Sequence, residues 1–329
     1  TGKPLERPPW PMVILRTPKG WTGPTVIDGK QIEGSFRSHQ VPGKDAKTNP
    51  AHLSAIEHWL KSYKPEELFD RNGTPIGVIR ALCPNGASRM ALNPHGFGGE
   101  IRKPLHLPTI EDHGIALLAP GAAQLSSVEE LGHYLRDVIK LNSAALNFRI
   151  VCPDELESNR IGAVLDVTDR QYAWPVSDAT EHTSKDGRVL EVLSEHNCQG
   201  WLQGYLLTGR HGLFPCYEAF LPIVDGMMNQ YAKFIKASIE VPWRKPISSL
   251  NYLLTSEAWR QEHNGYSHQG PGFINNVLTK KGHIHRVYFP PDANTLLVTT
   301  EHCLKVTNFI NLIVAGKQAM PQWLDLAAA

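Results

Sequence analysis

The sequence predicts an α/β fold, a mainly parallel sheet with helices on both faces. Two observations lead to this prediction. From about residue 101 onward, short apolar runs alternate with longer amphipathic stretches, the order expected of strands joined by helices. The apolar runs are nearly continuous, as in strands that are buried on both faces. With 329 residues, 41% of them apolar, the chain can bury a sizeable core and hold two domains or parts of domains.

Residues 127–141 are expected to form the first helix of this region. Leu131, Leu135, Val138 and Ile139 share one face of it, and serines before it can cap its start. The expected strands are 148–152, 189–193, 249–254, 286–289 and 309–314. The expected helices between them include 196–207, 218–237, 272–279 and 293–303.

The first hundred residues are broken more often by proline and glycine. A short strand is expected at 12–16, a helix near 52–63, and turns at Asn72 and Asn85, which each precede a glycine. This part resembles an incomplete domain. Because the sequence begins with Thr1 rather than methionine, we expect it to be a segment of a longer polypeptide.

Composition excludes several classes of protein. The net charge is +1 and the basic residues are scattered, so nothing favours nucleic acid or an anionic membrane as a partner. No apolar stretch is long enough to span a bilayer and no signal peptide is recognisable, so a cytoplasmic location is expected. The five cysteines are widely spaced without a Cys-x-x-Cys pair, which predicts free thiols.

Local sequence fingerprints exclude further classes. The chain has no P-loop, no His-Glu-x-x-His zinc motif and no Gly-x-Ser-x-Gly nucleophile elbow. The glycine-rich patch at 96–99 lacks the spacing and setting of a dinucleotide site, and we interpret it as a turn or connector.

Two polar segments follow predicted strands. Residues 261–272 place His263, His268, three amides and a carboxylate in a glycine-rich loop, and Glu195 follows the strand at 189–193. In parallel sheets ligands lie beyond the carboxyl ends of the strands, so these segments predict a ligand site there. The alternatives are a polar surface loop and, for Glu195, an acid in the first turn of a helix.

Several cationic side chains also stand at strand edges. Residues 154–160 bring Ser158 and Arg160 together after a strand, where the guanidinium suits phosphate. A capped helix with a surface ion pair is the alternative. Arg244 and Lys317 place further cations where a phosphorylated substrate can bind, although each can equally be a solvated terminus.

Aromatic and loop residues complete the candidate set. Tyr217 and Phe220, which come one helix after Glu195, can stack on a flat heteroaromatic ring, or they can belong to the core. Lys19 and His39 lie in loops that glycine and proline make rigid. For that pair a solvated loop is the alternative.

Together these segments resemble phosphoketolases, the thiamine-diphosphate enzymes that cleave xylulose 5-phosphate or fructose 6-phosphate with inorganic phosphate. The resemblance runs through almost the whole chain. However, the Gly-Asp-Gly motif of the family's amino-terminal domain is absent, and nothing beyond Trp323 resembles its carboxy-terminal domain. The matching segments are 17–24, 34–42, 158–160, 167–169, 193–196, 207–212, 242–248, 261–271 and 315–318.

The resemblance implies a domain organisation. Residues 1–100 correspond to the end of the diphosphate-binding domain and a linker, and residues 101–329 to the transketolase-like pyrimidine-binding domain, a thiamine-diphosphate-binding fold. The family's carboxy-terminal domain is then absent. It further implies a homo-oligomer, a dimer or higher, with the cofactor at the subunit interface and with the Mg²⁺ ligands in the missing diphosphate-binding part. The chain alone is therefore expected to be inactive.

The resemblance also implies a role for each matched residue. Glu195 is expected to hydrogen-bond the aminopyrimidine of the cofactor and activate it, with Tyr217 and Phe220 stacking on that ring and Lys19 close to the cofactor. Proton transfer is assigned to His39, His263 and His268. Inorganic phosphate is assigned to Ser158, Arg160, Gln261 and Asn264, and the sugar phosphate to Arg244 and Lys317. The expected products are acetyl phosphate and an aldose phosphate, either glyceraldehyde 3-phosphate or erythrose 4-phosphate.

Two other functions stay open from the sequence. A transketolase-like enzyme would transfer the two-carbon unit to an aldose, and phosphate-dependent formation of acetyl phosphate distinguishes the two reactions. A non-catalytic, histidine-rich fragment would instead bind metal through His263 and His268, although ligand-like spacing is scarce.

Overall fold

The computed structural model describes residues 12–89, 92, 102–173, 175–177, 180–255 and 267–329. The chain divides into two compact units, Thr1–Asn85 and Gly86–Ala329, and each is described by itself. The sequence-based boundary between the two regions, at residues 100 and 101, stays a prediction.

Among its described residues, the first unit contains one antiparallel hairpin and mostly short helices. In the helix expected near 52–63, the Asn49 side chain accepts hydrogen bonds from the first backbone amides, and Pro50 supplies a suitable first position. That helix is confirmed. The elements are β1 (Val26–Ile27), β2 (Lys30–Gln31), α1 (Pro50–Ser62), α2 (Gly77–Leu82) and the 3₁₀ helices η1 (Phe36–His39) and η2 (Pro65–Glu67).

The strand expected at 12–16 is wrong, because the structure assigns no regular element there. The side chains of Met12, Val13, Ile14 and Leu15 are 73–85% exposed, so this apolar run is not buried as a sheet strand would be. No pairing to this segment is found among the described residues, and a strand without a partner does not form a sheet. The first strand is β1 instead.

The second unit is built on a parallel sheet, which confirms the predicted fold class. Its strand order is β10-β11-β9-β8-β4-β7-β5-β6, and each of the pairings that connect these strands is parallel. The five expected strands are present with ends shifted by two residues or fewer. The strands are β4 (Phe148–Cys152), β5 (Arg170–Gln171), β6 (Thr183–Ser184), β7 (Val189–Glu191), β8 (His211–Cys216), β9 (Leu250–Leu254), β10 (His285–Tyr288) and β11 (Ile310–Val314). Outside this sheet, β3 (Gln124–Ser126) pairs antiparallel with β12 (Ala319–Pro321).

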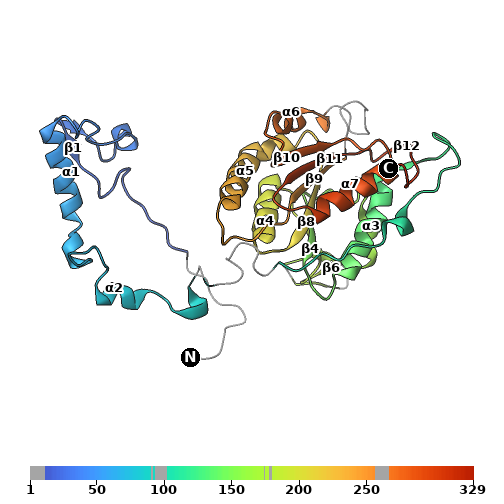
Figure 1. Cartoon of the computed structure of the whole chain (residues 1–329), viewed down its shortest axis with the longest axis horizontal. Coiled ribbons are helices and arrows are strands. Elements are labelled where there is room, and N and C mark those ends of the chain that lie inside the picture. The colour runs from blue at the N-terminus through green and yellow to red at the C-terminus, as the bar shows by residue number, and fades with distance from the viewer. Residues whose placement is uncertain (1–11, 90–91, 93–101, 174, 178–179, 256–266) are drawn as a thin grey trace. The chain divides into compact units, whose positions relative to one another are not determined.

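Helices cover both faces of the sheet (Figure 1). The connections through α4, α5 and α6 all progress toward β10, whereas the connection through α7 returns from β10 to β11. Because such crossovers are right-handed, α7 lies on the opposite face, together with α3. The α-helices are α3 (Ser127–Leu141), α4 (Glu195–Leu207), α5 (Asp225–Ile239), α6 (Gly272–Leu278) and α7 (Ala293–Lys305), and the 3₁₀ helices include η3 (Gly86–Ser88), η5 (Ile110–His113), η6 (Gly162–Asp166) and η7 (Leu221–Val224).

Two expectations for this unit need correction. The central strand β8 was not predicted, since its sequence contains Gly212 and Pro215. The helix expected at 218–237 begins only at Asp225, because Pro222 lies in a short 3₁₀ helix that precedes it. The residues just after β8 are thereby left in a turn at the end of the strand.

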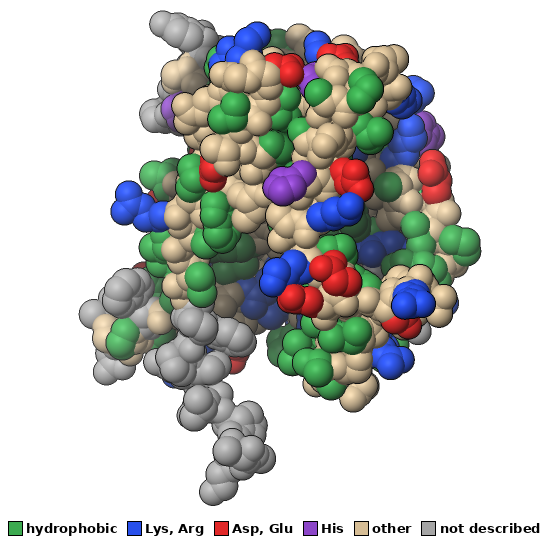
Figure 2. Space-filling model, turned by 90° about the vertical axis from the view of Figure 1, so that its left-hand side faces the viewer, with side chains coloured by type: hydrophobic (Ala, Val, Ile, Leu, Met, Phe, Trp, Pro, Cys, Tyr) green, Lys and Arg blue, Asp and Glu red, His purple; other side chains and the backbone are tan. Residues whose placement is uncertain are grey.

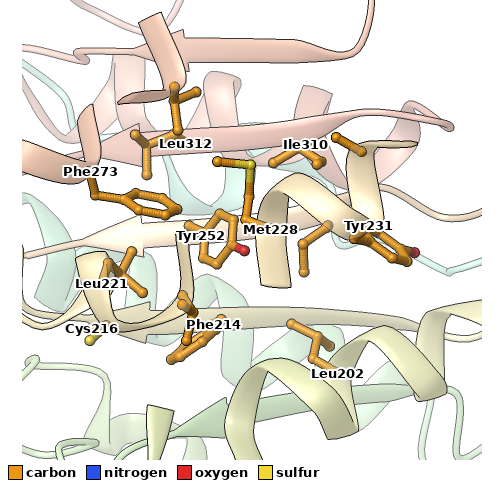
Figure 3. Packing of buried hydrophobic residues seen from close by; sticks show 14 of the residues in the cluster. Leu202, Phe214, Cys216, Leu221, Met228, Tyr231, Tyr252, Phe273, Ile310 and Leu312 are labelled. Atoms are coloured by element: carbon orange, nitrogen blue, oxygen red, sulfur yellow. The ribbon is translucent and has the colours of Figure 1, made fainter. Parts of the chain in front are cut away.

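Each face of the sheet has its own core. Alternation along β9 sends Tyr252 toward α4, α5 and α6, and Leu253 toward α3 and α7. Figure 3 shows Tyr252 near Phe214 and Phe273, with ring centroids 5.7 and 5.2 Å away. Its hydroxyl donates to Gln199 Oε1 at 2.7 Å, so the buried polar group is paired. Burying one such side chain contributes about 1.5–3 kcal/mol.

On the face in Figure 2, Lys and Arg side chains are interspersed with Asp and Glu, which accords with the net charge of +1. Among the described residues, no helix has the length and apolar character needed to cross a membrane. All five cysteines are free thiols, as expected, and all but Cys83 are buried.

Candidate active site at the carboxyl edge of the sheet

Five neighbouring strands end at one edge of the sheet, where most of the candidate residues follow them. In spatial order β11, β9, β8, β4 and β7 are parallel, so their carboxyl ends meet there. Lys317 follows β11, Tyr217 follows β8, Ser158 follows β4 and Glu195 follows β7. Residues that are 22 to 159 positions apart in the sequence are thus collected at one edge.

Three rings cluster beyond β8 and β9. The His268 ring lies 5.1 Å from the centroids of both Tyr217 and Phe220, which are 6.1 Å apart from each other. Two hydrogen bonds fix the loop that carries His268: its carbonyl accepts from Ala219 N at 3.3 Å, and Gly270 N donates to Glu218 Oε2 at 3.1 Å. Ser267 Oγ lies 2.8 Å from His268 Nδ1, at hydrogen-bond distance. Hydrogen bonds thus join the loop that carries His268 to the turn after β8 that carries Tyr217 and Phe220.

Lys317 joins this ring cluster from β11. Its Nζ lies 4.0 Å from the centroid of the Tyr217 ring, and the residue is only 7% exposed. A buried ammonium over an aromatic face is stabilised by the ring quadrupole. The Tyr217 ring therefore helps to stabilise the positive charge of Lys317 at this edge of the sheet. Burial also raises the pKa of the Tyr217 hydroxyl, and its hydrogen bond with Ser158 opposes that shift. A cation, a phenol and an imidazole thus lie together.

Glu195 opens helix α4 directly after β7. The Ser194 side chain caps the helix by accepting from Asn197 N at 3.3 Å, so Glu195 occupies the first turn, where the helix dipole favours a carboxylate. Glu195 is partly exposed. Its carboxylate contributes to raising the pKa of the neighbouring Glu155. Glu195 therefore lies in the first turn of a helix and, at the same time, at the carboxyl edge of the sheet.

Glu155 belongs to the same edge but was not among the predicted site residues. Burial, mainly, and the neighbouring Glu195 carboxylate raise the pKa of Glu155 to about 7, while Asn159, the Tyr217 backbone and Lys317 oppose the shift. Its Oε2 is buried without a hydrogen-bond partner among the described residues. Unpaired buried carboxyl oxygens are costly and are concentrated at functional sites. The only sequence signal was its position after a buried strand.

Ser158 and Arg160 stand on a tight loop after β4. Asp154 and Arg160 both adopt left-handed backbone conformations, with φ of 64° and 63°, which non-glycine residues seldom adopt. Both Ser158 and Arg160 are exposed. Below them, the Thr255 hydroxyl donates to Asn159 Oδ1, and this bond ties the loop to the end of β9. The predicted pair is therefore presented at the carboxyl edge.

Arg244 does not lie with these residues. It precedes β9, so it stands at the amino end of that strand, whereas Lys317 and Tyr217 lie beyond the carboxyl ends. Its guanidinium lies 4.8 Å from the centroid of the Phe234 ring on α5. Within this chain the structure thus separates the two cations that the sequence analysis assigned to one sugar phosphate.

Lys19 and His39 belong to the first unit. The segments that carry them lie side by side, since Gly34 N donates to the Lys19 carbonyl at 2.7 Å. Gly20, with φ of 77°, packs so close to Ser38 that an added Cβ would lie 2.5 Å from the serine Cβ. Lys19 and His39 are both exposed. Two segments of the resemblance are therefore in contact.

The remaining predicted residues, Gln261, His263 and Asn264, lie outside the described residues, as does the glycine patch at 96–99. Within the part that the structure describes, no group of three or more His, Cys, Asp or Glu side chains could hold a metal ion.

These features define the class: an α/β protein with a candidate ligand site at the carboxyl edge of a parallel sheet. The chain belongs to the D-xylulose 5-phosphate/D-fructose 6-phosphate phosphoketolase family, whose model matches residues 129–306. A second model, that of the family's N-terminal domain, matches residues 2–101. The resemblance on which the sequence analysis rested is thereby confirmed.

Curated relatives match nearly the whole chain. A probable phosphoketolase of Rhodopseudomonas palustris (strain HaA2) is 58% identical over 323 residues, which cover 98% of this chain and 41% of the relative. One from Bradyrhizobium diazoefficiens is 55% identical over 327 residues, or 99% of this chain and 41% of the relative. The chain thus spans about 41% of the length of these relatives.

Solved transketolases are more distant. A Pichia stipitis transketolase in complex with sedoheptulose 7-phosphate has 15% identity and a TM-score of 0.49, over 83% of this chain and 36% of that one. The Leishmania mexicana transketolase has 14% identity and a TM-score of 0.46, over 83% and 34%.

Proposed function

We propose that the full-length protein, of which this chain forms a part, is a thiamine-diphosphate-dependent phosphoketolase. Its substrates would be xylulose 5-phosphate, fructose 6-phosphate or both, and inorganic phosphate. Its products would be acetyl phosphate and the matching aldose phosphate. The family match supports the proposal. The observation that carries it is the arrangement of Glu195, the Tyr217, Phe220 and His268 ring cluster, and Lys317 at one edge of the sheet.

The residues present at this edge fit the pyrimidine half of the cofactor. Tyr217 and Phe220 offer aromatic surface for a flat ring, and Glu195 offers a partly exposed carboxylate that can hydrogen-bond a ring nitrogen. The side chains of Glu155 and Asn159 add buried polar groups to this edge, beside Glu195. When bound, thiamine diphosphate supplies the carbon nucleophile and electron sink that the protein lacks.

The histidines are proposed to move protons. His268 is half-buried between two rings and oriented by Ser267, so its imidazole is held at the edge where a ketose would lie. Phosphoketolase chemistry needs a base when the carbon–carbon bond breaks and an acid when water is expelled. His39, His263 and His268 share those tasks in the proposal, and Lys19 is placed close to the cofactor.

Phosphate groups are proposed to bind at cationic and hydroxyl side chains. The buried ammonium of Lys317 suits the phosphate of the sugar, because a desolvated charge attracts an anion more strongly than a solvated one. Ser158 and Arg160, together with Gln261 and Asn264, are proposed to bind inorganic phosphate. Arg244 keeps its proposed part in binding the sugar phosphate on the resemblance alone, since it lies at the other end of β9.

The remaining features of the family are proposed as well. Residues 1–100 would complete the diphosphate-binding domain, residues 101–329 would form the pyrimidine-binding domain, and the Mg²⁺ ligands would lie in parts of the full-length protein outside this chain. The protein would act in the cytoplasm as a homo-oligomer with the cofactor between subunits, and would need neither nucleic acid nor a membrane.

Product analysis tests the reaction. We expect the full-length protein, given thiamine diphosphate and Mg²⁺, to release acetyl phosphate from xylulose 5-phosphate only when inorganic phosphate is present. Acetyl phosphate is measured as its hydroxamate. Transfer of the two-carbon unit to an added aldose phosphate, with no acetyl phosphate formed, would instead identify a transketolase-like enzyme and overturn the proposal.

A further inference from the structure

A pocket lined by several basic residues lies away from the carboxyl edge. Its volume is about 540 Å³, within the range of small-molecule sites, and it lies between α5 and the segment that joins α6 to β10. Because that segment ends in His285, the first residue of β10, the pocket is at the amino edge of the sheet. Lys317 and the ring cluster lie beyond the other ends of the parallel strands, so the two sites are separate.

The charge of this pocket is one-sided. None of the described residues that line it is acidic, although acidic and basic residues are nearly equal in number in the whole chain. Opposing walls therefore present cations to the same space, which raises the local concentration of anions. The basic lining residues are Lys233 and Lys236 on α5 and Lys280, Lys281, His283 and His285 on the facing segment.

His285 supplies an independent indication of a ligand. The residue is only 9% exposed and lines the pocket, and both of its ring nitrogens are buried. Burial lowers the pKa of His285, a hydrogen bond to the Lys281 carbonyl opposes that shift, and the nearby Lys280 and His283 side chains lower the pKa further. The imidazole would donate to a bound anion once its ring turns toward the pocket.

We propose that this pocket binds a small molecule that carries two or more phosphate groups. A single phosphate would leave one wall of a pocket of about 540 Å³ without contact, whereas two linked phosphates can reach the lysines of α5 and those of the facing segment together. The site serves a ligand other than the reactants proposed for the carboxyl edge. The proposal of this pocket is therefore independent of the proposed reaction.

Calorimetric titration of the 329-residue chain with inorganic pyrophosphate tests the proposal, with sulfate at equal ionic strength as the reference anion. We expect saturable pyrophosphate binding that is weakened about tenfold or more by the double substitution Lys233→Gln and Lys280→Gln, which removes one cation from each wall. His285→Gln should weaken it as well. Circular dichroism and the melting temperature establish that each variant is folded.

Two controls separate this site from other basic surfaces. Lys103→Gln with Lys185→Gln removes the same charge from exposed positions outside both sites, and should leave the affinity unchanged. Lys317→Gln should also leave it unchanged, which distinguishes the pocket from the carboxyl edge. The proposal is overturned if no saturable binding is seen, if sulfate binds equally well, or if the control pair or Lys317→Gln weakens binding as much as the pocket pair.

Discussion

The raised pKa of Glu155 at the carboxyl edge makes the stability of the chain depend on pH. Its folded pKa is about 7, against 4.5 for the ordinary glutamate, mainly because of burial. Below pH 4.5 the carboxyl is protonated in both states, so the shift has no effect on stability. As pH rises toward 7, the unfolded chain loses the proton while the folded chain keeps it, so the free energy of unfolding falls over that range and stays lower above it.

Glu155→Gln removes this loss, because the amide stays neutral. Relative to the wild-type chain, we expect the variant to gain about 2 kcal/mol in free energy of unfolding between pH 5 and pH 8, at about 1.4 kcal/mol per pKa unit. Urea unfolding at several pH values measures both proteins. Parallel pH dependences would contradict the raised pKa.

Lys317 is, of the two cations proposed to bind the sugar phosphate, the one at the carboxyl edge. Lys317→Gln in the full-length protein should raise KM for xylulose 5-phosphate about tenfold or more, with a smaller change in kcat, because a charge-assisted contact made in both ground and transition states is lost. Initial-rate kinetics measure both constants.

Two further variants make the Lys317 result interpretable. Lys317→Arg keeps the charge and should restore part of the affinity. Lys305→Gln removes an exposed lysine that pairs with Glu301 at 2.8 Å, and should leave KM unchanged. A fall in kcat at unchanged KM in Lys317→Gln would contradict the assignment.

At the scale of elements, α4 packs closely on β8. Substitution by alanine should therefore change the stability in opposite directions at a glycine inside this contact and at a glycine outside it. A Cβ on Gly212 in β8 would lie 2.5 Å from Leu202 Cδ1 and 2.7 Å from the Arg149 carbonyl, so Gly212→Ala should cost about 1–3 kcal/mol through overpacking. Gly204, exposed within α4, has nothing within 4 Å of the same position. Gly204→Ala should therefore stabilise by about 0.5–1 kcal/mol.

Chemical denaturation of both variants measures this contrast. The matched pair controls for the change of glycine to alanine itself, so only the surroundings differ. Equal effects at the two positions would contradict the packing of α4 on β8.

The elements that the sequence predicted are those with a clear period or a clear cap. α3 has the bounds expected, since its apolar face repeats at helical spacing and Ser126 Oγ accepts from Glu129 N at 3.1 Å. β8 escaped prediction because glycine and proline normally argue against an inner strand. The structure accommodates Pro215, which pairs in register with Leu253 of β9, whereas the pairing with β4 ends at Leu213.

At the scale of the whole molecule, sequence order explains which site residues could be predicted. Alternating strands and helices imply a parallel sheet, and a parallel sheet collects the residues that follow its strands, so Glu195 and residues 261–272 were expected at one edge. The position of Arg244 at the other edge and the buried state of Glu155 could not be predicted. The position of Arg244 depends on which end of β9 it precedes, and the state of Glu155 depends on its burial. No local sequence pattern encodes either property.

The central claim is that Glu195 activates the cofactor at this edge. In the full-length protein, Glu195→Gln should lower acetyl phosphate formation from xylulose 5-phosphate by about 10³-fold, the scale of a lost proton-transfer group, while thiamine diphosphate binding is largely kept. Glu111→Gln, at an exposed position in η5, is the matched control and should retain activity. Turnover by Glu195→Gln at the rate of that control would contradict the account.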